Sequence, residues 1–503
     1  MSVADPQPLP LVGPVVLVGP PGAGKSTVGA LAAARLGLPF VDLDVELGRA
    51  AGSSADEVFA NEGETSFRVH EAAALARVVD GRNVLVAAGA GVVDAAPNRA
   101  LLARAHVIWL DVDDDTALAR LAGARPWLPE DREAQRVAYR LREGQRRTQR
   151  AALAGARVDG RTTPEQAAAA LAQVVAALPL PTSTWRGDVL VQAEVVERGV
   201  DTLDLERAGS MVLVDDGVPT SVAGLRLPGG EAHKNALGLE RVLRALNERG
   251  ERGATGPIVA VGGGAFLDLV GTAAALWRRG TPWIAVPTTP LAMADAALGG
   301  KTALDVGDTK NAAGALHAPQ QTLLAFALLH GATPAMFTDG LAEALKHAWL
   351  AGEALDDVHE PTRWVRRSLA IKAGVVGRDP REHGLRTALN LGHTVGHALE
   401  RVHGLSHGEA VRRGLQSALW LSERLLGLDP AVSSMLRASA ARLGPLPPLV
   451  LDEARALAAL RRDKKGGAFV LLAALGRAVL LVPPDDAVRA SLAEAARACP
   501  EAP

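Results

Sequence analysis

Short hydrophobic runs alternate with segments of helical periodicity through the first third of the chain. The runs occupy residues 15–18, 40–41, 84–86 and 107–110. A helix is predicted over residues 25–36, and a last helix begins at the capping residues Thr163 and Pro164 and runs to about residue 178. Strands that alternate with helices are typical of a parallel sheet covered on both faces. We therefore predict an α/β domain over residues 11–178.

A second series of hydrophobic runs follows residues 179–187, a proline-containing polar segment that we interpret as a linker. The runs occupy residues 189–192, 211–214, 258–261 and 283–286. They predict a second α/β domain over residues 188–325. From about residue 326 long segments rich in Ala, Leu and Arg replace the strands, and they predict a mostly α-helical domain over residues 326–503.

Composition and charge narrow the class of protein. Hydrophobic residues make up 48% of the 503 residues and charged residues 22%, which is the balance of a globular protein with several cores. Lys plus Arg (54) nearly equals Asp plus Glu (56), so no basic excess is available to bind nucleic acid. Cys499 is the single cysteine, and neither a signal peptide nor an 18-residue apolar run is evident. We expect a cytoplasmic protein that binds neither nucleic acid nor membrane.

The clearest motif lies directly after the first hydrophobic run. Residues 19–27 fit the pattern G-x-x-x-x-G-K-[ST] between a predicted strand and a predicted helix. Glycines let backbone N–H groups turn around phosphate oxygens, the lysine reaches the β- and γ-phosphates, and the hydroxyl binds Mg²⁺. The motif residues that we expect to bind ATP and Mg²⁺ are Gly22, Gly24, Lys25, Ser26 and Thr27. The alternative is a tight glycine turn without a ligand.

Further polar residues follow the next strands of the same sheet. Asp42 and Asp44 end the second strand, where one carboxylate suits hydrated Mg²⁺ and the other a substrate hydroxyl whose proton it can accept. Arg68 can grip a substrate carboxylate, although alone it would be read as a solvated helix surface. Residues 89–91 form a second glycine turn, and Arg125 opens an arginine-rich segment suited to a lid.

Residues 11–178 resemble the shikimate kinase family at these positions. The resemblance implies a P-loop kinase fold in which Asp44, Arg68, Gly89 and Gly91 hold shikimate, Asp42 helps to place Mg²⁺, and Arg125 covers the ATP phosphates. Two segments differ from the family pattern. The triple glycine contains Ala90, and the Arg-x-Pro-Leu-Tyr segment reads Arg-Arg-Thr-Gln-Arg over residues 146–150. Arg146 is the best candidate for the family's second carboxylate-binding arginine, with Arg147 as the alternative.

A second glycine-rich turn lies in the second α/β domain. Residues 262–264 connect a strand to a helix that carries Asp268 in its first turn, as in a dinucleotide pyrophosphate site. Taken alone, this pattern is equally compatible with a dinucleotide site and with a tight structural turn that binds no ligand. Additional polar side chains lie in a loop and after a strand of the same sheet: Glu231, Lys234, Thr288 and Thr289.

The helical domain carries a metal-binding pattern. His393 and His397 lie four residues apart on one helical face, and His407 follows a glycine-containing turn. Glu343 precedes Lys346 by three residues on another helix. One glutamate with two histidines is a set used for catalytic Zn²⁺, although a single histidine is more often structural. Basic residues near these motifs suggest contacts to phosphate and carboxylate, the alternative being surface charge: Lys301, Lys310, Lys346, Lys372, Arg386 and Lys464.

Residues 188–480 resemble the 3-dehydroquinate synthase family over these motifs. The resemblance implies that Glu343, His393 and His407 bind Zn²⁺ or Co²⁺ and that His397 is an active-site residue without being a ligand. The implied substrate contacts are Asp295, Lys301, Lys346, Lys372, Arg386, Asn390 and Lys464. The implied NAD contacts are Glu231, Lys234, Gly264, Asp268, Thr288, Thr289, Lys301 and Lys310. Arg279 would reach the neighbouring subunit's site in a homodimer.

The two resemblances imply one chain with two activities of the shikimate pathway. The first is the phosphorylation of shikimate by Mg²⁺–ATP. The second is the NAD- and metal-dependent cyclisation of 3-deoxy-D-arabino-heptulosonate 7-phosphate to 3-dehydroquinate with release of phosphate. The alternatives are another small-molecule kinase, such as one for gluconate, or a regulatory nucleotide-binding domain, joined to a related sugar-phosphate cyclase or a polyol dehydrogenase.

Overall fold

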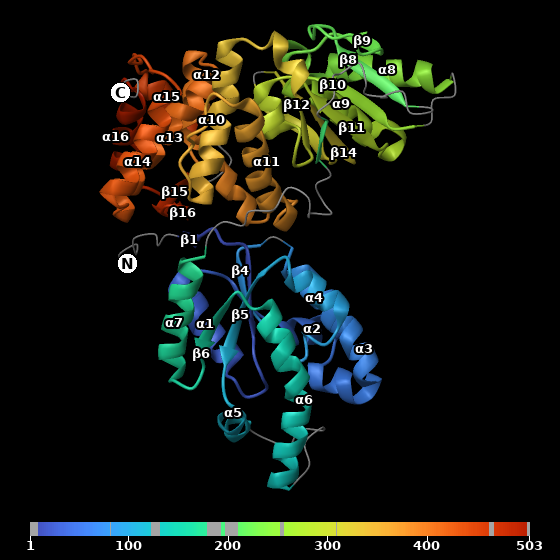
Figure 1. Ribbon diagram of the computed structural model, residues 1–503, viewed down its shortest axis with the longest axis vertical. Coiled ribbons are helices and arrows are strands. Elements are labelled where there is room, and N and C mark those ends of the chain that lie inside the picture. Colours follow the sequence, from blue (N-terminus) through green and yellow to red (C-terminus); the bar gives the residue numbers. More distant parts are fainter. Residues whose placement is uncertain are drawn as a thin grey trace. The chain divides into compact units, whose positions relative to one another are not determined.

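The structure is a computed structural model that describes residues 9–80, 82–121, 131–178, 193–196, 210–251, 256–307, 309–461 and 467–499 (Figure 1). The chain forms two compact units. Unit 1 comprises residues 1–180, 381–388 and 477–481, and unit 2 comprises the remaining segments. The predicted linker, residues 179–187, lies outside the described residues, as does the strand predicted at 189–192.

Unit 1 contains a five-stranded sheet in which every neighbouring pair is parallel, with the strand order β3-β4-β2-β5-β6. Its strands are β2 (Pro14–Val18), β3 (Phe40–Asp42), β4 (Val84–Ala87), β5 (His106–Asp111) and β6 (Ala156–Asp159). The helices are α1 (Lys25–Leu36), α2 (Leu43–Ala51), α3 (Ala55–Val78), α4 (Ala96–Leu102), α5 (Asp114–Arg120), α6 (Arg132–Leu153) and α7 (Pro164–Ala176). This confirms the predicted α/β domain with a parallel sheet.

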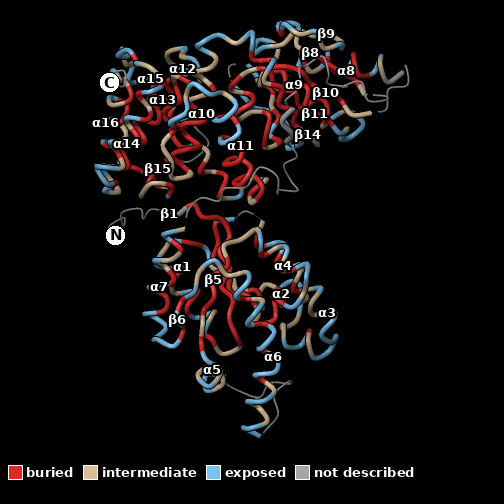
Figure 2. The backbone as a smooth tube through the Cα atoms, viewed as in Figure 1, coloured by how far each residue is buried: buried red, intermediate tan, exposed pale blue. Residues whose placement is uncertain are grey.

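The central strand β2 explains why the sequence reads as a continuous hydrophobic run. Val15 and Leu17 pack into one core with α1 and α7, whereas Val16 and Val18 pack into a second core with α2 and α3. A strand buried on both faces has no polar positions, so alternation is lost. In Figure 2 the tube is drawn as buried in the centre of this sheet, around the label β5. Thr163 caps α7, as predicted, by accepting a hydrogen bond from the backbone N–H of Gln166.

Unit 2 contains a six-stranded parallel sheet with the order β7-β14-β11-β10-β8-β9. Its strands are β7 (Ala193–Val196), β8 (Met211–Asp215), β9 (Leu225–Leu227), β10 (Ile258–Gly262), β11 (Trp283–Pro287) and β14 (Gln321–Ala325). Helices α8 (Ala236–Glu251) and α9 (Gly264–Leu276) belong to the same region. An antiparallel hairpin of β12 (Lys301–Val306) and β13 (Thr309–Leu316) was not predicted, because its short side chains and glycines give no hydrophobic alternation.

The later part of the chain is mostly helical, as predicted. Its α-helices are α10 (Pro334–Ala351), α11 (Pro361–Arg378), α12 (His393–His403), α13 (His407–Leu426), α14 (Pro430–Ala441), α15 (Glu453–Arg461) and α16 (Asp485–Ala495). Shorter helical turns are η2 (Glu231–His233), η3 (Trp277–Arg279), η4 (Ala292–Ala296), η5 (Phe326–Gly331) and η6 (Leu385–Asn390). The remaining strands are β1 (Leu9–Pro10), β15 (Phe469–Ala474) and β16 (Arg477–Leu481), and β1 pairs with β16 in unit 1. Among the described helices, none combines the length and apolarity that crossing a membrane requires.

Candidate active sites

The glycine-rich loop between β2 and α1 has the geometry of a phosphate-binding loop. Gly22 has a φ of +80°, and a Cβ at this position would lie 2.1 Å from the carbonyl oxygen of Ala117. Only glycine fits such a backbone. Lys25 begins α1, and its ammonium donates to two carbonyl oxygens of the loop at 2.9 and 3.1 Å. Burial, together with the positive charge of Arg150, lowers the pKa of Lys25 to about 8.

Two oxygen-bearing side chains meet beside this loop. The Ser26 hydroxyl donates to Asp42 Oδ2 at 2.5 Å, and Asp42 Oδ1 accepts a hydrogen bond from the backbone N–H of Asp44 at 3.0 Å. The second contact caps α2 and therefore fixes the Asp42 side chain at the end of β3. A hydroxyl and a carboxylate so placed are the oxygen ligands that Mg²⁺ prefers.

The second glycine turn brings together the residues predicted to bind the acceptor. A Cβ on Gly89 would lie 3.0 Å from Asp44 Oδ1, so this carboxylate lies directly against the turn. A Cβ on Gly91 would lie 2.4 Å from Arg68 Nη2 and 2.7 Å from Arg146 Nη2. Side chains from α2, α3 and α6 therefore approach the backbone of the turn so closely that a Cβ there would displace their polar ends.

A carboxylate that the sequence analysis did not identify joins the two arginines. Asp94 accepts hydrogen bonds from Arg68 Nη2 at 3.3 Å and from Arg146 Nε at 2.9 Å. Arg147, the alternative to Arg146, instead donates to Asp114 Oδ1 at 2.9 Å. The geometry therefore places Arg146 with Arg68, and their guanidinium groups already share one carboxylate.

Arg150 connects the two segments that differ from the shikimate kinase pattern. It takes the position of the tyrosine in that pattern, and its buried guanidinium donates to the carbonyl oxygen of Ala90 at 3.0 Å. It also forms an ion pair with the buried carboxylate of Glu143 at 2.6 Å. The two departures are thus in contact with each other. Arg125, the predicted lid residue, lies outside the described residues.

In unit 2 the glycine turn after β10 lies against the end of β11. The two strands pair in parallel register up to Gly262, whose carbonyl oxygen accepts a hydrogen bond from the Thr288 N–H at 3.0 Å. A Cβ on Gly263 would lie 3.2 Å from the methyl group of Thr289. Gly264 begins α9, and the buried Thr288 hydroxyl has no hydrogen-bond partner among the described residues. These features suit a turn that approaches a dinucleotide closely.

Lys234 is the centre of a charged cluster next to this turn. Its buried ammonium forms ion pairs with Glu231 at 2.9 Å, Asp268 at 3.5 Å and Asp305 at 3.6 Å. It also donates to Asn311 Oδ1 at 2.8 Å. Burial raises the pKa of Asp268 to about 7 even though Lys234 opposes the shift. The structure therefore groups three of the predicted NAD contacts.

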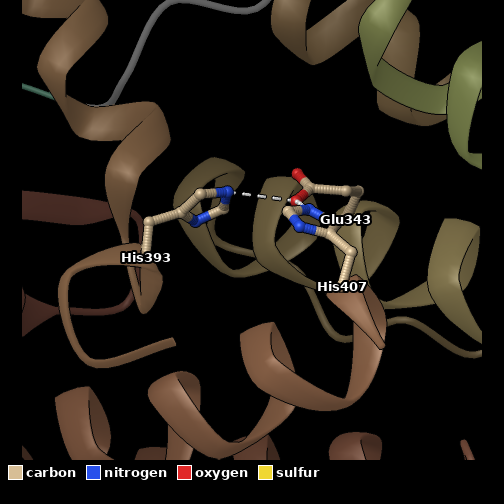
Figure 3. Close-up of side chains that lie close together, drawn as sticks. All are labelled: Glu343, His393 and His407. Carbon is tan, nitrogen blue, oxygen red and sulfur yellow. Dashed lines mark hydrogen bonds and ion pairs between the residues drawn. The ribbon is translucent and has the colours of Figure 1, made fainter. Parts of the chain in front are cut away.

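Three helices bring the predicted metal ligands to one point (Figure 3). Glu343 lies in α10, whereas His393 and His407 are the first residues of α12 and α13. Glu343 Oε1 lies 3.2 Å from His393 Nε2 and 3.0 Å from His407 Nε2. One ligand atom from each residue lies within 4.8 Å of the others, and Glu343 is fully buried. One carboxylate and two imidazoles in this arrangement fit a divalent metal with open coordination positions.

The charges around this point stabilise the ionised carboxylate. Glu343 forms an ion pair with the buried Lys346. Burial would raise the pKa of Glu343, but Lys346 and His393 outweigh it and hold this pKa well below its usual value. Burial would lower the pKa of His407, but the carboxylates of Glu343 and Glu400 raise it to about 10.

Asp295 forms a neighbouring charged group in the π-helical turn η4. Its carboxylate lies 2.7 Å from Lys372 Nζ and 3.6 Å from His347 Nε2. His347, which the sequence analysis missed, contacts the Ser368 hydroxyl through Nδ1 at 2.7 Å. Ligand atoms of Asp295, Glu343 and His347 also lie within 4.8 Å of one another, but the positive charge of Lys372 already neutralises Asp295.

The other predicted residues of the synthase site differ in exposure and in the contacts that they make. The His397 ring is exposed, and its centroid lies 5.1 Å from that of His393. Lys310 forms an ion pair with Glu400 at 2.7 Å. Lys301 is exposed at the start of β12, Asn390 ends η6, and Arg386 is buried in the part of η6 that belongs to unit 1. Lys464 lies outside the described residues.

Comparisons with known proteins cover both units. A family model described as shikimate kinase matches residues 21–176. Models described as 3-dehydroquinate synthase N-terminal and C-terminal match residues 224–339 and 340–466. A bifunctional shikimate kinase/3-dehydroquinate synthase of Thermotoga maritima is 31% identical over 473 residues, which span 90% of this chain and 93% of that relative.

Two solved structures share the fold of the larger part of this chain. A 2-deoxy-scyllo-inosose synthase is 24% identical with a TM-score of 0.53, and the match covers 60% of this chain and 96% of that one. The 2-epi-5-epi-valiolone synthase of Streptomyces hygroscopicus subsp. jinggangensis is 24% identical with a TM-score of 0.52, over 62% and 98% of the two chains. These matches confirm the predicted fold class. The family models and the long relative show that the chain belongs to the bifunctional shikimate kinase/3-dehydroquinate synthase family.

Proposed function

We propose that the two activities of the family are carried out by two separate active sites of this chain, the kinase site and the synthase site. The proposal places the kinase residues around the phosphate loop and the glycine turn of unit 1, and most synthase residues around the metal ligands and the glycine turn of unit 2. Arg386, which the family resemblance assigns to the synthase, belongs to unit 1. The observation that carries the synthase assignment is the convergence of Glu343, His393 and His407. The chain's substrates are small molecules.

In the kinase site each set of side chains has a distinct proposed role. The phosphate loop with Lys25 would hold the ATP phosphates, and Ser26 with Asp42 would hold Mg²⁺. Arg68 and Arg146 would bind the shikimate carboxylate, since two guanidinium forks converge there. Asp44 faces the glycine turn and would accept the proton of the hydroxyl that attacks the γ-phosphate.

In the synthase site Glu343, His393 and His407 would bind the metal, and the turn after β10 would bind NAD. The chemistry that these groups would supply when bound is a Lewis acid at a substrate hydroxyl and a reversible acceptor for the hydride on the carbon of that hydroxyl, with no net formation of NADH. The 2-deoxy-scyllo-inosose synthase structure holds NAD⁺ with Co²⁺, and the valiolone synthase structure holds NAD⁺ with Zn²⁺. A carboxylate–imidazole set accepts either ion.

The phosphate and carboxylate groups of the substrate require positively charged side chains, and several such side chains lie near the proposed metal ligands. Lys346 and Lys372 are buried beside Glu343 and Asp295, so their ammonium groups are held in place before substrate binds. The proposal makes His397, which is exposed beside His393, an active-site residue that does not bind the metal. The proposal assigns the remaining substrate contacts to Asp295, Lys301, Arg386, Asn390 and Lys464.

The proposal includes a homodimer in which Arg279 reaches the partner's site, and a cytoplasmic location. Arg278 and Arg279 have φ values of 49° and 63°, a conformation that costs free energy in residues with a Cβ. Two consecutive residues in this conformation support a functional role for the turn. The free Cys499 is consistent with a reducing compartment.

A two-substrate assay with a transition-metal chelator tests the proposed function. The full chain receives either shikimate with Mg²⁺–ATP or heptulosonate 7-phosphate with NAD, with and without dipicolinate and with Mg²⁺ in excess. We expect the chelator to abolish phosphate release from the heptulosonate, Zn²⁺ or Co²⁺ to restore it, and shikimate phosphorylation to be unaffected. Accumulation of NADH would indicate a polyol dehydrogenase, and ATP binding without phosphorylation of shikimate would indicate a regulatory domain.

The glycine turn of the kinase provides a sharper test of the acceptor pocket. Gly91→Ala should raise the KM for shikimate about ten- to a hundredfold, because the new methyl group displaces the guanidinium groups of Arg68 and Arg146. These are the ends of flexible side chains, so the variant should fold normally. The KM for ATP should stay within twofold. Steady-state kinetics with each substrate varied in turn measures both values.

Gly144→Ala is the matched control, since a Cβ on this exposed residue of α6 would meet no atom within 4 Å. It should leave both KM values unchanged. An unchanged KM for shikimate in Gly91→Ala would place the acceptor carboxylate elsewhere.

A further inference from the structure

Glu400 in α12 connects a metal-ligating histidine to the hairpin of unit 2. One carboxylate oxygen lies 3.6 Å from His407 Nδ1, and the other accepts a hydrogen bond from Lys310 Nζ at 2.7 Å. The Glu400 side chain is 15% exposed, so water competes little for these contacts. The sequence analysis assigned Glu400 no role.

The two histidines are oriented alike, each by an acceptor on its Nδ1 side. His393 Nδ1 lies 3.2 Å from the carbonyl oxygen of Leu391, and His407 Nδ1 faces Glu400. In both rings Nε2 points to Glu343 Oε1. An acceptor on one ring nitrogen fixes the tautomer and leaves the other nitrogen free to bind a metal. Among the contacts described, Glu400 provides this acceptor for the His407 ring.

Lys310 keeps the Glu400 carboxylate in place from the other side. It lies in β13 next to Asn311, whose side chain accepts the hydrogen bond from the buried Lys234. The backbone N–H of Asn311 also donates to Asp305 Oδ1 at 2.7 Å. The hairpin end that carries Lys310 is therefore held by two polar contacts, and its ammonium is presented to Glu400 from a fixed backbone.

We propose that Glu400 is a positioning residue that holds the His407 imidazole with Nε2 directed at the metal, and that Lys310 acts on the metal through Glu400. This inference rests on the proposed metal-dependent function. It gives Lys310 a role besides the NAD contact implied by the family resemblance.

Metal affinity, measured without substrate, tests the inference. Metal-free wild-type and Glu400→Gln chains compete for Zn²⁺ with a chromophoric chelator at one pH. We expect Glu400→Gln to weaken Zn²⁺ binding about ten- to a hundredfold, the effect typical of losing a residue that orients a metal ligand. The matched control is Glu423→Gln in α13, the helix of His407, where the glutamate pairs with Arg437 at 2.8 Å. The control should bind Zn²⁺ as the wild type does, and thermal unfolding of the metal-free proteins checks that each variant is folded.

A double-mutant cycle tests the link to Lys310. Lys310→Met should weaken Zn²⁺ binding less than Glu400→Gln, and the double variant should bind no more weakly than Glu400→Gln alone. Additive effects would overturn the claim that Lys310 acts through Glu400. Equal affinity of Glu400→Gln and the wild type would overturn the positioning role itself. A wild-type chain that binds no Zn²⁺ or Co²⁺ would instead contradict the proposed function, so the two failures are distinguishable.

Discussion

His393→Ala should slow phosphate release from the heptulosonate substrate at least about a thousandfold, equivalent to about 4 kcal/mol of transition-state stabilisation. The variant removes one of the three proposed metal ligands, and it leaves the carboxylate of Glu343 and the imidazole of His407. Two ligands do not hold a divalent metal in the geometry that catalysis needs. Phosphate release and bound metal, measured on the same preparation, check this expectation.

The control for this variant is His330→Ala, which replaces an exposed histidine of η5 outside the metal cluster. Its phosphate release should match that of the wild type. Shikimate phosphorylation should stay within twofold in both variants, because the kinase residues lie in unit 1. Retention of metal and of synthase activity in His393→Ala would refute the ligand set.

Lys25→Ala should produce the opposite pattern. Shikimate phosphorylation should fall about a thousandfold, because the ammonium that neutralises the transferred phosphate charge is lost. The Lys25 ammonium lies against the carbonyl oxygens of the phosphate loop, so the variant removes the cation that the loop itself holds in place. Synthase activity should be unchanged. Coupled assays of ADP formation and of phosphate release measure the two effects.

Arg35→Ala provides the comparison for Lys25→Ala, since it removes an exposed cation from the last turn of the same helix. It should leave ADP formation at the wild-type rate. Loss of both activities in Lys25→Ala would contradict the assignment of two independent sites.

The sequence predicted those parts of the sites that depend on neighbouring residues. The strand–loop–helix unit around Lys25 was placed correctly because a buried strand, a glycine loop and a helix start follow one another within residues 14–36. The spacing of His393 and His397 likewise predicted that both lie on one helix, and α12 carries both. The ligand set of Glu343, His393 and His407 came from the family resemblance. Parallel pairing of β10 with β11 then brings Thr288 to the glycine turn, as expected from residues that follow strands of one sheet.

The parts that the sequence did not reveal depend on contacts between distant segments. Asp94 lies 52 positions from Arg146, and Glu400 lies 90 positions from Lys310. Each is a carboxylate in an otherwise ordinary helical or turn segment, so its local pattern indicates only a surface charge. The β12–β13 hairpin was missed for a related reason: the residues of β13 are mostly small and exposed and show no hydrophobic alternation, and the strand is defined by its pairing with β12.

Asp94 has a consequence for how the proposed kinase pocket selects its acceptor. Because Arg68 and Arg146 already hold a carboxylate, a substrate acid that binds them has to displace Asp94, and the free energy lost with Asp94 offsets part of what the two arginines provide. In the proposed pocket a simple carboxylic acid would therefore bind more weakly than two guanidinium groups alone suggest. The ring hydroxyls within reach of Asp44 and the glycine turn would supply the additional free energy that distinguishes a polyol acid from a simple one.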